Sequence, residues 1–161
     1  MTNVSLRSQI LTTVRGLFQA VAKDAPLADP YPFAWSRAEL GPLTMGDFNK
    51  TYTIGIVAGD ETKSDLYPLK ACTLPIAIEF QRVRQKDEST PGELAEETLT
   101  LVQRVINEAS NGGHNTLGLD FVIDVSETGN HIDLDSFADK AILGVLYIDV
   151  HYRHARYDTR I

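Results

Sequence analysis

The chain has 161 residues, of which 43% are hydrophobic and 23% charged, with a formal net charge of −7 at pH 7. This size and composition predict one globular domain, residues 1–161, with a core of its own. The acidic balance argues against binding duplex nucleic acid, because that affinity depends on lysine and arginine at the phosphates. A single cysteine, Cys72, excludes an internal disulfide framework and a cysteine-cluster metal site. No apolar run reaches the roughly 18 residues of a membrane helix, and the first residues do not form a secretory signal, so we expect no membrane contact and a reducing cytosol.

The first predicted element is a helix over residues 4–23. Apolar residues recur there at spacings of three and four, which gives one buried stripe: Leu6, Ile10, Val14, Leu17, Phe18 and Val21. The helix is expected to end at Asp24-Ala25-Pro26, since proline disfavours helical geometry in the residue before it.

Residues 25–50 combine loop-forming and aromatic residues. Four prolines and two glycines indicate a loop, whereas Tyr31, Phe33, Trp35 and Phe48 indicate that the loop packs on something. Long loops without structure of their own are usually functional or disordered. We interpret residues 25–50 as a docking loop, with a short strand at residues 33–36.

A β-hairpin is predicted next. Residues 52–58 alternate as a strand, residues 59–65 form its polar tip, and residues 66–84 return as a long strand. Pro68 and Pro75 cannot donate ladder hydrogen bonds, so the return strand is expected to contain an edge portion or a bulge. Two pairing registers remain open for it.

The second helix has the clearest boundary signal. Thr90-Pro91-Gly92-Glu93 matches a capping box with proline at the first helical position. An apolar stripe follows, and Asn111-Gly112-Gly113 provides the stop.

Strands complete the predicted domain. Residues 117–125 alternate, residues 127–130 form a turn, residues 132–135 continue as a short strand, and residues 141–154 form the closing strand. A polar tail, residues 155–161, follows. The predicted fold is α+β, a two-layer sandwich with a mixed or antiparallel sheet of about 4–5 strands and two helices packed on one face.

Residues with metal or acid–base chemistry do not assemble into a recognisable site. His151 and His154 lie three apart on a strand and therefore face opposite sides of the sheet, which disfavours a shared metal ion. Asp120, Asp124 and Asp149 are expected to share a polar sheet face, which suits either solvation or carboxylate chemistry. The sequence contains no phosphate-binding glycine loop and no nucleophile elbow. We therefore expect no enzyme activity, no catalytic residue, no metal and no cofactor, with an aspartate-based metal hydrolase as the remote alternative.

Five segments together carry a resemblance to a known family: LRSQILTTVRGLF, YTIGIVAGDE, TLPIAIEFQRV, TPGELAEETLTLVQRVI and GVLYIDVHYRH. In layout and texture the chain resembles the tail terminator proteins of long-tailed bacteriophages, also called minor tail or tail completion proteins. The resemblance covers most of the chain and rests on element order rather than on a catalytic signature.

The resemblance implies a structural virion protein. It would form a homohexameric ring on the last ring of the tail tube, stop tube polymerisation and present a surface to the head-side neck or stopper protein. DNA would pass through without specific binding, and an acidic ring suits such passage. The expected location is the head-proximal end of the tail, and the host cytoplasm during assembly. A head–tail connector, as a neck stopper or adaptor, is the alternative, and a small binding module without a virion role is a further one.

Candidate ring contacts follow from exposure and composition rather than from a family motif. Closed rings use heterologous interfaces, so two different flanks of the domain should meet. The candidates come from the aromatic loop, the predicted hairpin tip, the segment before the second helix and the polar tail: Tyr31, Phe33, Trp35, Asp60, Lys63, Arg82, Arg84, Lys86, Arg153 and Arg156.

Overall fold

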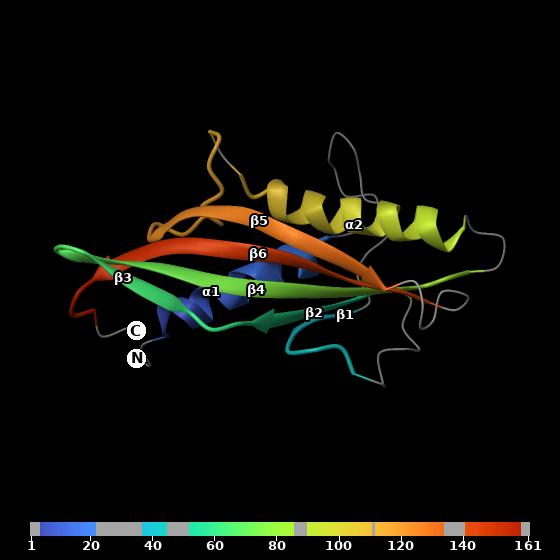
Figure 1. Cartoon of the computed structure of the whole chain (residues 1–161), viewed down its shortest axis with the longest axis horizontal. Coiled ribbons are helices and arrows are strands. Elements are labelled where there is room, and N and C mark those ends of the chain that lie inside the picture. The colour runs from blue at the N-terminus through green and yellow to red at the C-terminus, as the bar shows by residue number, and fades with distance from the viewer. Residues whose placement is uncertain are drawn as a thin grey trace.

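The computed structural model describes residues 4–21, 37–44, 52–85, 90–110, 112–133 and 141–158. These residues form two helices and six strands (Figure 1). In chain order the elements are α1 (Leu6–Gln19), β1 (Arg37–Leu40), β2 (Tyr52–Ala58), β3 (Thr62–Leu66), β4 (Leu69–Val83), α2 (Pro91–Asn107), β5 (Val122–Asp133) and β6 (Ala141–Ala155).

The strands form one sheet in the order β1-β2-β4-β6-β5, and β3 also pairs with β4. β1 runs parallel to β2, and the other pairs are antiparallel. The predicted α+β sandwich with a mixed sheet is confirmed. Within the described residues the sheet contains six strands rather than four or five, because β1 and β3 form in segments that were expected to be loop and turn.

Both helices pack on the same face of the sheet. The buried stripe of α1 and that of α2 join the inward side chains of β2, β4 and β6 in one core, and α1 lies behind the strands in Figure 1. The long ladder between β4 and β6, which extends from Leu69↔Ala155 to Val83↔Ala141, runs through the centre of this core. Burying one face of a sheet under amphipathic helices is what the alternation in these strands favours.

Helix α1 is shorter than the predicted 4–23. It begins after Ser5, whose side chain accepts a hydrogen bond from the Ser8 amide, and it ends at Gln19. Its buried residues Leu6, Ile10, Val14 and Phe18 belong to the predicted stripe. Serine at the N-cap satisfies one of the free amides of the first turn.

The segment predicted as a docking loop contains a strand. Residues 37–40 form β1, so the loop interpretation of this part is wrong, and the predicted strand at residues 33–36 lies outside the described residues. The backbone then crosses over β2 at Gly55, where an added Cβ would lie 2.7 Å from the Gly41 carbonyl oxygen. Glycine at position 55 is therefore required for this close approach.

The tip of the hairpin lies further along the chain than predicted. Residues 62–66 form β3, paired with the start of β4 from Thr62↔Thr73 to Leu66↔Leu69, and the turn is Tyr67-Pro68. The prediction that residues 59–65 form a polar tip is wrong. Every residue of β3 is exposed, so it has no hydrophobic alternation, and its strand geometry comes from pairing with β4.

Pro75 lies in a central strand at the one place where its missing N–H is harmless. β2 ends opposite Ile76, β3 begins opposite Thr73, and the Gly59 amide donates to the Pro75 carbonyl at 2.8 Å. The nitrogen and carbonyl of a strand residue point to the same side, so the proline nitrogen faces the break between β2 and β3. This interruption takes the place of the predicted bulge or edge.

Helix α2 begins as predicted. The Thr90 side chain accepts from the Glu93 amide, and the Glu93 carboxylate accepts from the Thr90 amide, which completes the capping box. The helix ends at Asn107, a few residues before the predicted glycine stop.

We expect Thr90→Ala to lower the free energy of unfolding by about 1 kcal/mol, because it removes the acceptor for a first-turn amide. Thr100→Ala is the matched control, since Thr100 is an exposed residue inside the same helix. There alanine should be neutral or slightly stabilising. Denaturant unfolding of both variants measures the difference, and equal losses would contradict the capping role.

Strand β5 departs from the prediction at both ends. Residues 117–121 form a loop, held by the buried Asn115, whose side chain donates to the Ile106 carbonyl and accepts from the Leu117 amide. Leu117 has a positive φ of 53°, which is incompatible with a strand. The predicted turn at residues 127–130 is also wrong: the strand continues through it, with a register shift between Glu127 and Gly129. A β-bulge accommodates these turn-forming residues within the strand. The closing strand β6 is confirmed and runs one residue further, to Ala155.

Candidate interaction surfaces

Six of the ten predicted contact residues are described by the structure, and these lie in three places. Tyr31, Phe33, Trp35 and Lys86 are outside the described residues. Arg82 and Arg84 lie at the end of β4, beside the start of β6. Lys63, Arg153 and Arg156 lie at the opposite end of the sheet, where Lys63 faces Cys72 and Arg153 faces Ala71. Asp60 is an exposed residue between β2 and β3.

The Arg82 side chain makes its contacts within the fold. It is 6% exposed, its guanidinium lies 3.4 Å from both the Thr98 hydroxyl and the Glu97 carboxylate, and it stacks over the Tyr52 ring at 5.3 Å. These contacts hold α2 against the sheet. Exposed side chains are therefore better candidates for a partner.

The end of the sheet opposite Arg82 extends beyond the helices as an arm, which is at the left of Figure 1. We define the arm as residues 62–73 and 152–158, that is β3, the Tyr67-Pro68 turn, the start of β4, and the end of β6 with the residues after it. Three large side chains stand out from it: Leu66 is 53% exposed, Tyr67 85% and Tyr157 86%. The guanidinium of Arg156 lies 5.9 Å from the Tyr157 ring centre. Exposed aromatic and apolar side chains gathered at one tip are typical of an interaction site.

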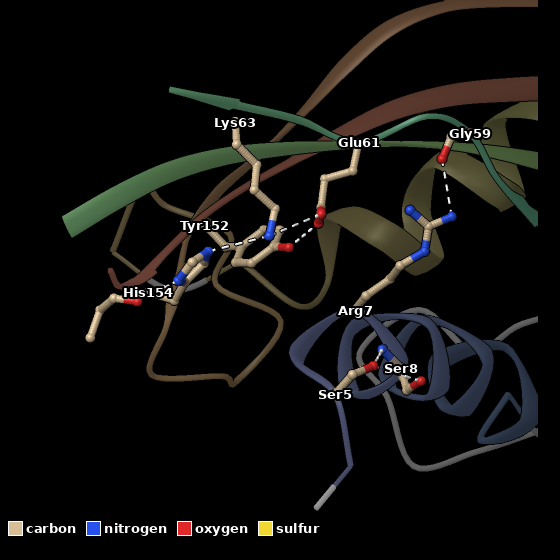
Figure 2. A network of polar contacts seen from close by, with 9 residues as sticks. Ser5, Arg7, Ser8, Gly59, Glu61, Lys63, Tyr152 and His154 are labelled. Atoms are coloured by element: carbon tan, nitrogen blue, oxygen red, sulfur yellow. Dashed lines mark hydrogen bonds and ion pairs between the residues drawn. The ribbon is translucent and has the colours of Figure 1, made fainter. Parts of the chain in front are cut away.

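A polar cluster holds the base of the arm (Figure 2). Tyr152, which is 2% exposed, donates its hydroxyl hydrogen to the Glu61 carboxylate. That carboxylate pairs with the Lys63 ammonium at 3.5 Å, and the ammonium lies 3.4 Å from Nε2 of His154. On the other side of the ring, His154 Nδ1 lies 2.6 Å from the Ala155 carbonyl oxygen. Because a carbonyl can accept but not donate, we assign the proton to Nδ1, which leaves Nε2 to accept from Lys63.

The same region ties the arm to α1. The Arg7 guanidinium donates to the Gly59 carbonyl at 3.1 Å, next to the break between β2 and β3 (Figure 2). Cys72 lies in β4 opposite Lys63 and Tyr152 and is buried. Burial raises the pKa of the Cys72 thiol, and the Lys63 charge opposes this effect in part. A buried thiol with a raised pKa is a core side chain rather than a nucleophile.

The sheet face turned away from the helices forms the second surface, which we call the open face. Among the described residues, no helix covers it. Described residues line two hollows on it, of about 310 and 380 Å³. Ala77 and Tyr147 line both, and Tyr147 is 44% exposed. The first is otherwise lined by Val57, Ala58, Gly59, Pro75, Ile76, Thr128, Ile148 and Asp149, and the second by Leu43, Glu79, Phe80, His131, Asp133, Leu143, Gly144 and Val145.

The predicted acidic face is incomplete. Asp124 faces His151 and Asp149 faces Ser126 across the β5–β6 pair, so these two aspartates share the open face. Asp120 lies in the turn before β5, which places it off the strand. The ring of His151 is held between the Thr73 hydroxyl at 3.2 Å and the Ser126 hydroxyl at 2.8 Å. In the part of the chain that the structure describes, no three histidine, cysteine or acidic side chains gather as a metal site. His151 and His154 lie on opposite faces, as expected from strand geometry.

Asp124 has a structural role. Its carboxylate accepts from the Asn115 amide at 3.0 Å, and this hydrogen bond lowers the pKa of Asp124 below its ordinary value. The bond fixes the loop between α2 and β5, because the buried Asn115 anchors that loop to the Ile106 carbonyl.

We expect Asp124→Asn to be less stable than the unsubstituted chain at pH 7, with a difference that narrows below about pH 4. A lowered pKa in the folded chain stabilises it above the unfolded-state pKa, and this contribution disappears as the pH falls through the folded-state value. Denaturant unfolding at pH 7 and pH 3 measures both differences. A difference that stays constant between the two pH values would contradict this assignment.

Sequence reasoning missed the residues that stand out most on both surfaces. Tyr147 lies on the polar side of a clean alternation, and an aromatic residue at such a position could have indicated an interaction surface. Tyr67 and Leu66 gave no such signal, since the position of the turn decides their exposure. In comparisons with known proteins, no family model and no curated protein sequence matches the chain. No helix among the described residues is long and apolar enough to cross a membrane.

Proposed function

We propose that this protein is a structural virion component, a ring that ends the tail tube of a long-tailed bacteriophage. In this role six copies sit on the last ring of tube subunits, stop further addition and offer the head-side neck or stopper protein a joining surface. The resemblance of the five sequence segments named above motivates the proposal.

The observation that best supports it is the presence of two unlike surfaces on one domain. One is the arm, which projects aromatic and basic side chains, and the other is the open face with its hollows. A closed ring needs this asymmetry, because each copy offers one surface to the neighbour ahead and another to the neighbour behind. An enzyme needs converging reactive groups instead, and the polar clusters described above are internally satisfied pairs.

The charge of the chain fits the passage of DNA. Each copy contributes a formal charge of −7, so a ring of copies surrounds its opening with a strongly acidic protein. Negative charge repels the phosphate backbone, and a strand that must slide through gains nothing from binding the wall.

The proposal is tested by electron microscopy of tails assembled from the phage's tail genes with and without this chain. We expect tubes of uniform length when the chain is present, and overlong tubes without it. Restoring the chain from a separate plasmid should restore the length, which controls for effects on neighbouring genes. Tubes of the same length in both preparations would overturn the proposal.

A head–tail connector is the second candidate, since a neck stopper or adaptor would use the same kind of ring surfaces. The same micrographs separate the two roles. A terminator is bound to tubes that have never met a head, whereas a connector leaves tube length unchanged and is found on the head portal.

A further inference from the structure

We propose that the arm of one copy docks on the open face of a second copy, with Tyr67 entering the hollow region beside Ala77 and Tyr147. The inference rests on the proposed ring and names its subunit interface. It assigns the arm and the open face to each other.

The apolar parts of the two surfaces match. The arm ends in Leu66 and Tyr67, which are more than half exposed. The hollows are lined mainly by small and apolar side chains, among them Val57, Pro75 and Ala77. An exposed tyrosine that fills a shallow apolar pocket is the usual anchor of a protein interface, because its ring is desolvated while its hydroxyl keeps a polar partner.

The charges match as well. Arg153 and Arg156 are exposed on the arm, and Lys70 lies beside them, paired with Asp65 at 2.6 Å. The hollows contain carboxylates: Asp149 in one, Glu79 and Asp133 in the other. Glu79 accepts from the Leu43 amide at 3.1 Å, so its position is fixed. A basic arm and an acidic face attract each other between copies, whereas two like faces would repel.

Pairing of sheet edges is the competing way to join two copies, and the described edges disfavour it. β5 has register shifts at two places, between Val122 and Asp124 and between Glu127 and Gly129. β1, the end strand on the other side, has four residues and carries Arg37 and Glu39, and β3 has five and carries Lys63 and Asp65. Bulges and charges of this kind protect edge strands from pairing with another chain. Docking of the arm on the open face leaves these edges as they are.

The arm is held in place before it meets a partner. Its base is braced by the bonds among Glu61, Lys63, Tyr152 and His154, and Arg7 links the neighbouring backbone to α1. A preorganised arm loses little conformational freedom on binding, which strengthens association.

Cross-linking between differently tagged copies tests the interface. One copy contains Ser64→Cys, at an exposed residue of the arm that leaves Tyr67 in place, and the other contains Ala77→Cys. A short bis-maleimide joins thiols that lie close together. The reaction is carried out in concentrated solution and on tail tubes. We expect a cross-linked mixed dimer from this pair. The unsubstituted chain should not react, since its cysteine is 3% exposed.

The matched control combines Ser64→Cys with Thr100→Cys, because Thr100 is exposed on α2, on the covered side of the sheet. Equal yields from the two pairs, or no mixed dimer in protein that sediments as an oligomer or is bound to tubes, would overturn the interface. A chain that remains monomeric in both settings would overturn it too. A cross-linked dimer of a protein that has no effect on tube length would support the interface and contradict the tail function. An effect on tube length without cross-linking would support the tail function and contradict the interface.

Single substitutions give an independent measure. Tyr67→Ser and Tyr147→Ser are each expected to weaken self-association about 30-fold, as for the loss of an interface hot spot. Both side chains are exposed in the isolated chain, so its unfolding should change little. Unchanged sedimentation equilibrium for both variants would contradict the proposal.

Discussion

Replacing Phe80 with alanine is expected to lower the free energy of unfolding by about 3–5 kcal/mol, the largest effect that we predict for a single substitution. Phe80 is fully buried on the helix side of β4 and faces Gly144 of β6 across the central ladder. Its ring fills the space that a side chain at position 144 would occupy. Removing the ring leaves a cavity in the middle of the core, which its neighbours can close only in part.

Gly144→Ala tests the same contact from the other strand. A Cβ at position 144 would lie 2.4 Å from Cζ of Phe80 and 3.0 Å from the His131 carbonyl oxygen. Such overpacking should cost about 1–3 kcal/mol. The double variant Phe80→Ala/Gly144→Ala should lose less stability than the two single losses together, because each change relieves the problem created by the other.

Denaturant unfolding of the two single variants and the double variant gives the coupling energy. Ile123→Ala, at a residue 44% exposed on β5, is the control and should cost much less. Strictly additive losses would contradict the pairing of Phe80 with Gly144, and with it the register of the β4–β6 ladder.

Glu61→Ala is expected to loosen the arm and to lower the free energy of unfolding by about 1–3 kcal/mol, as for a buried donor that loses its acceptor. The substitution leaves the Tyr152 hydroxyl without the carboxylate that accepts from it and removes the ion-pair partner of Lys63. Hydrogen exchange should show faster exchange of β3 amides, with little change in α2. Self-association should weaken as well, because a looser arm must be ordered on binding.

Asp65→Ala is the matched control on the same arm. The Asp65 side chain is 70% exposed, whereas that of Glu61 is 15% exposed, and each pairs with a lysine. The ammonium of Lys70 lowers the pKa of Asp65 by hydrogen bonding, yet exposed pairs of this kind contribute little to stability. We therefore expect no measurable change in unfolding. Equal behaviour of the Glu61 and Asp65 variants would show that the cluster does not brace the arm.

Elements whose signals are local could be predicted from the sequence. The start of α2 is encoded by Thr90, Pro91 and Glu93 within one helical turn, and the capping box forms as expected. The closing strand is encoded by alternation, and its buried residues Leu146, Ile148, Val150 and Tyr152 follow the predicted pattern. Such signals require no knowledge of distant neighbours.

Elements that depend on a distant partner could not be predicted. Residues 62–66 read as a turn because they are polar, but the free edge of β4 beyond β2 gives them a strand partner. Residues 127–130 read as a turn for the same reason, but pairing with β6 and a bulge keep them in the sheet. In both cases tertiary pairing overrides local propensity.

Only part of the two surfaces could be predicted from the sequence. Lys63, Arg153 and Arg156 were candidates, and the structure brings them to one arm. Arg82 was also a candidate, but it is buried against α2. A surface is defined by which residues share an end of the sheet, and this follows from the register. The register could not be predicted from the sequence, because it depends on where along β4 the strand β2 ends and β3 begins, on either side of Pro75.

The most direct test of the proposed function is electron microscopy of purified tail tube protein that polymerises in the presence of this chain. We predict a ring with sixfold symmetry at one end of each tube and an arrest of growth at that end. Tyr67→Ser protein at the same concentration should leave the tubes growing. Tubes that elongate without a bound ring in the presence of the unsubstituted protein would contradict the account.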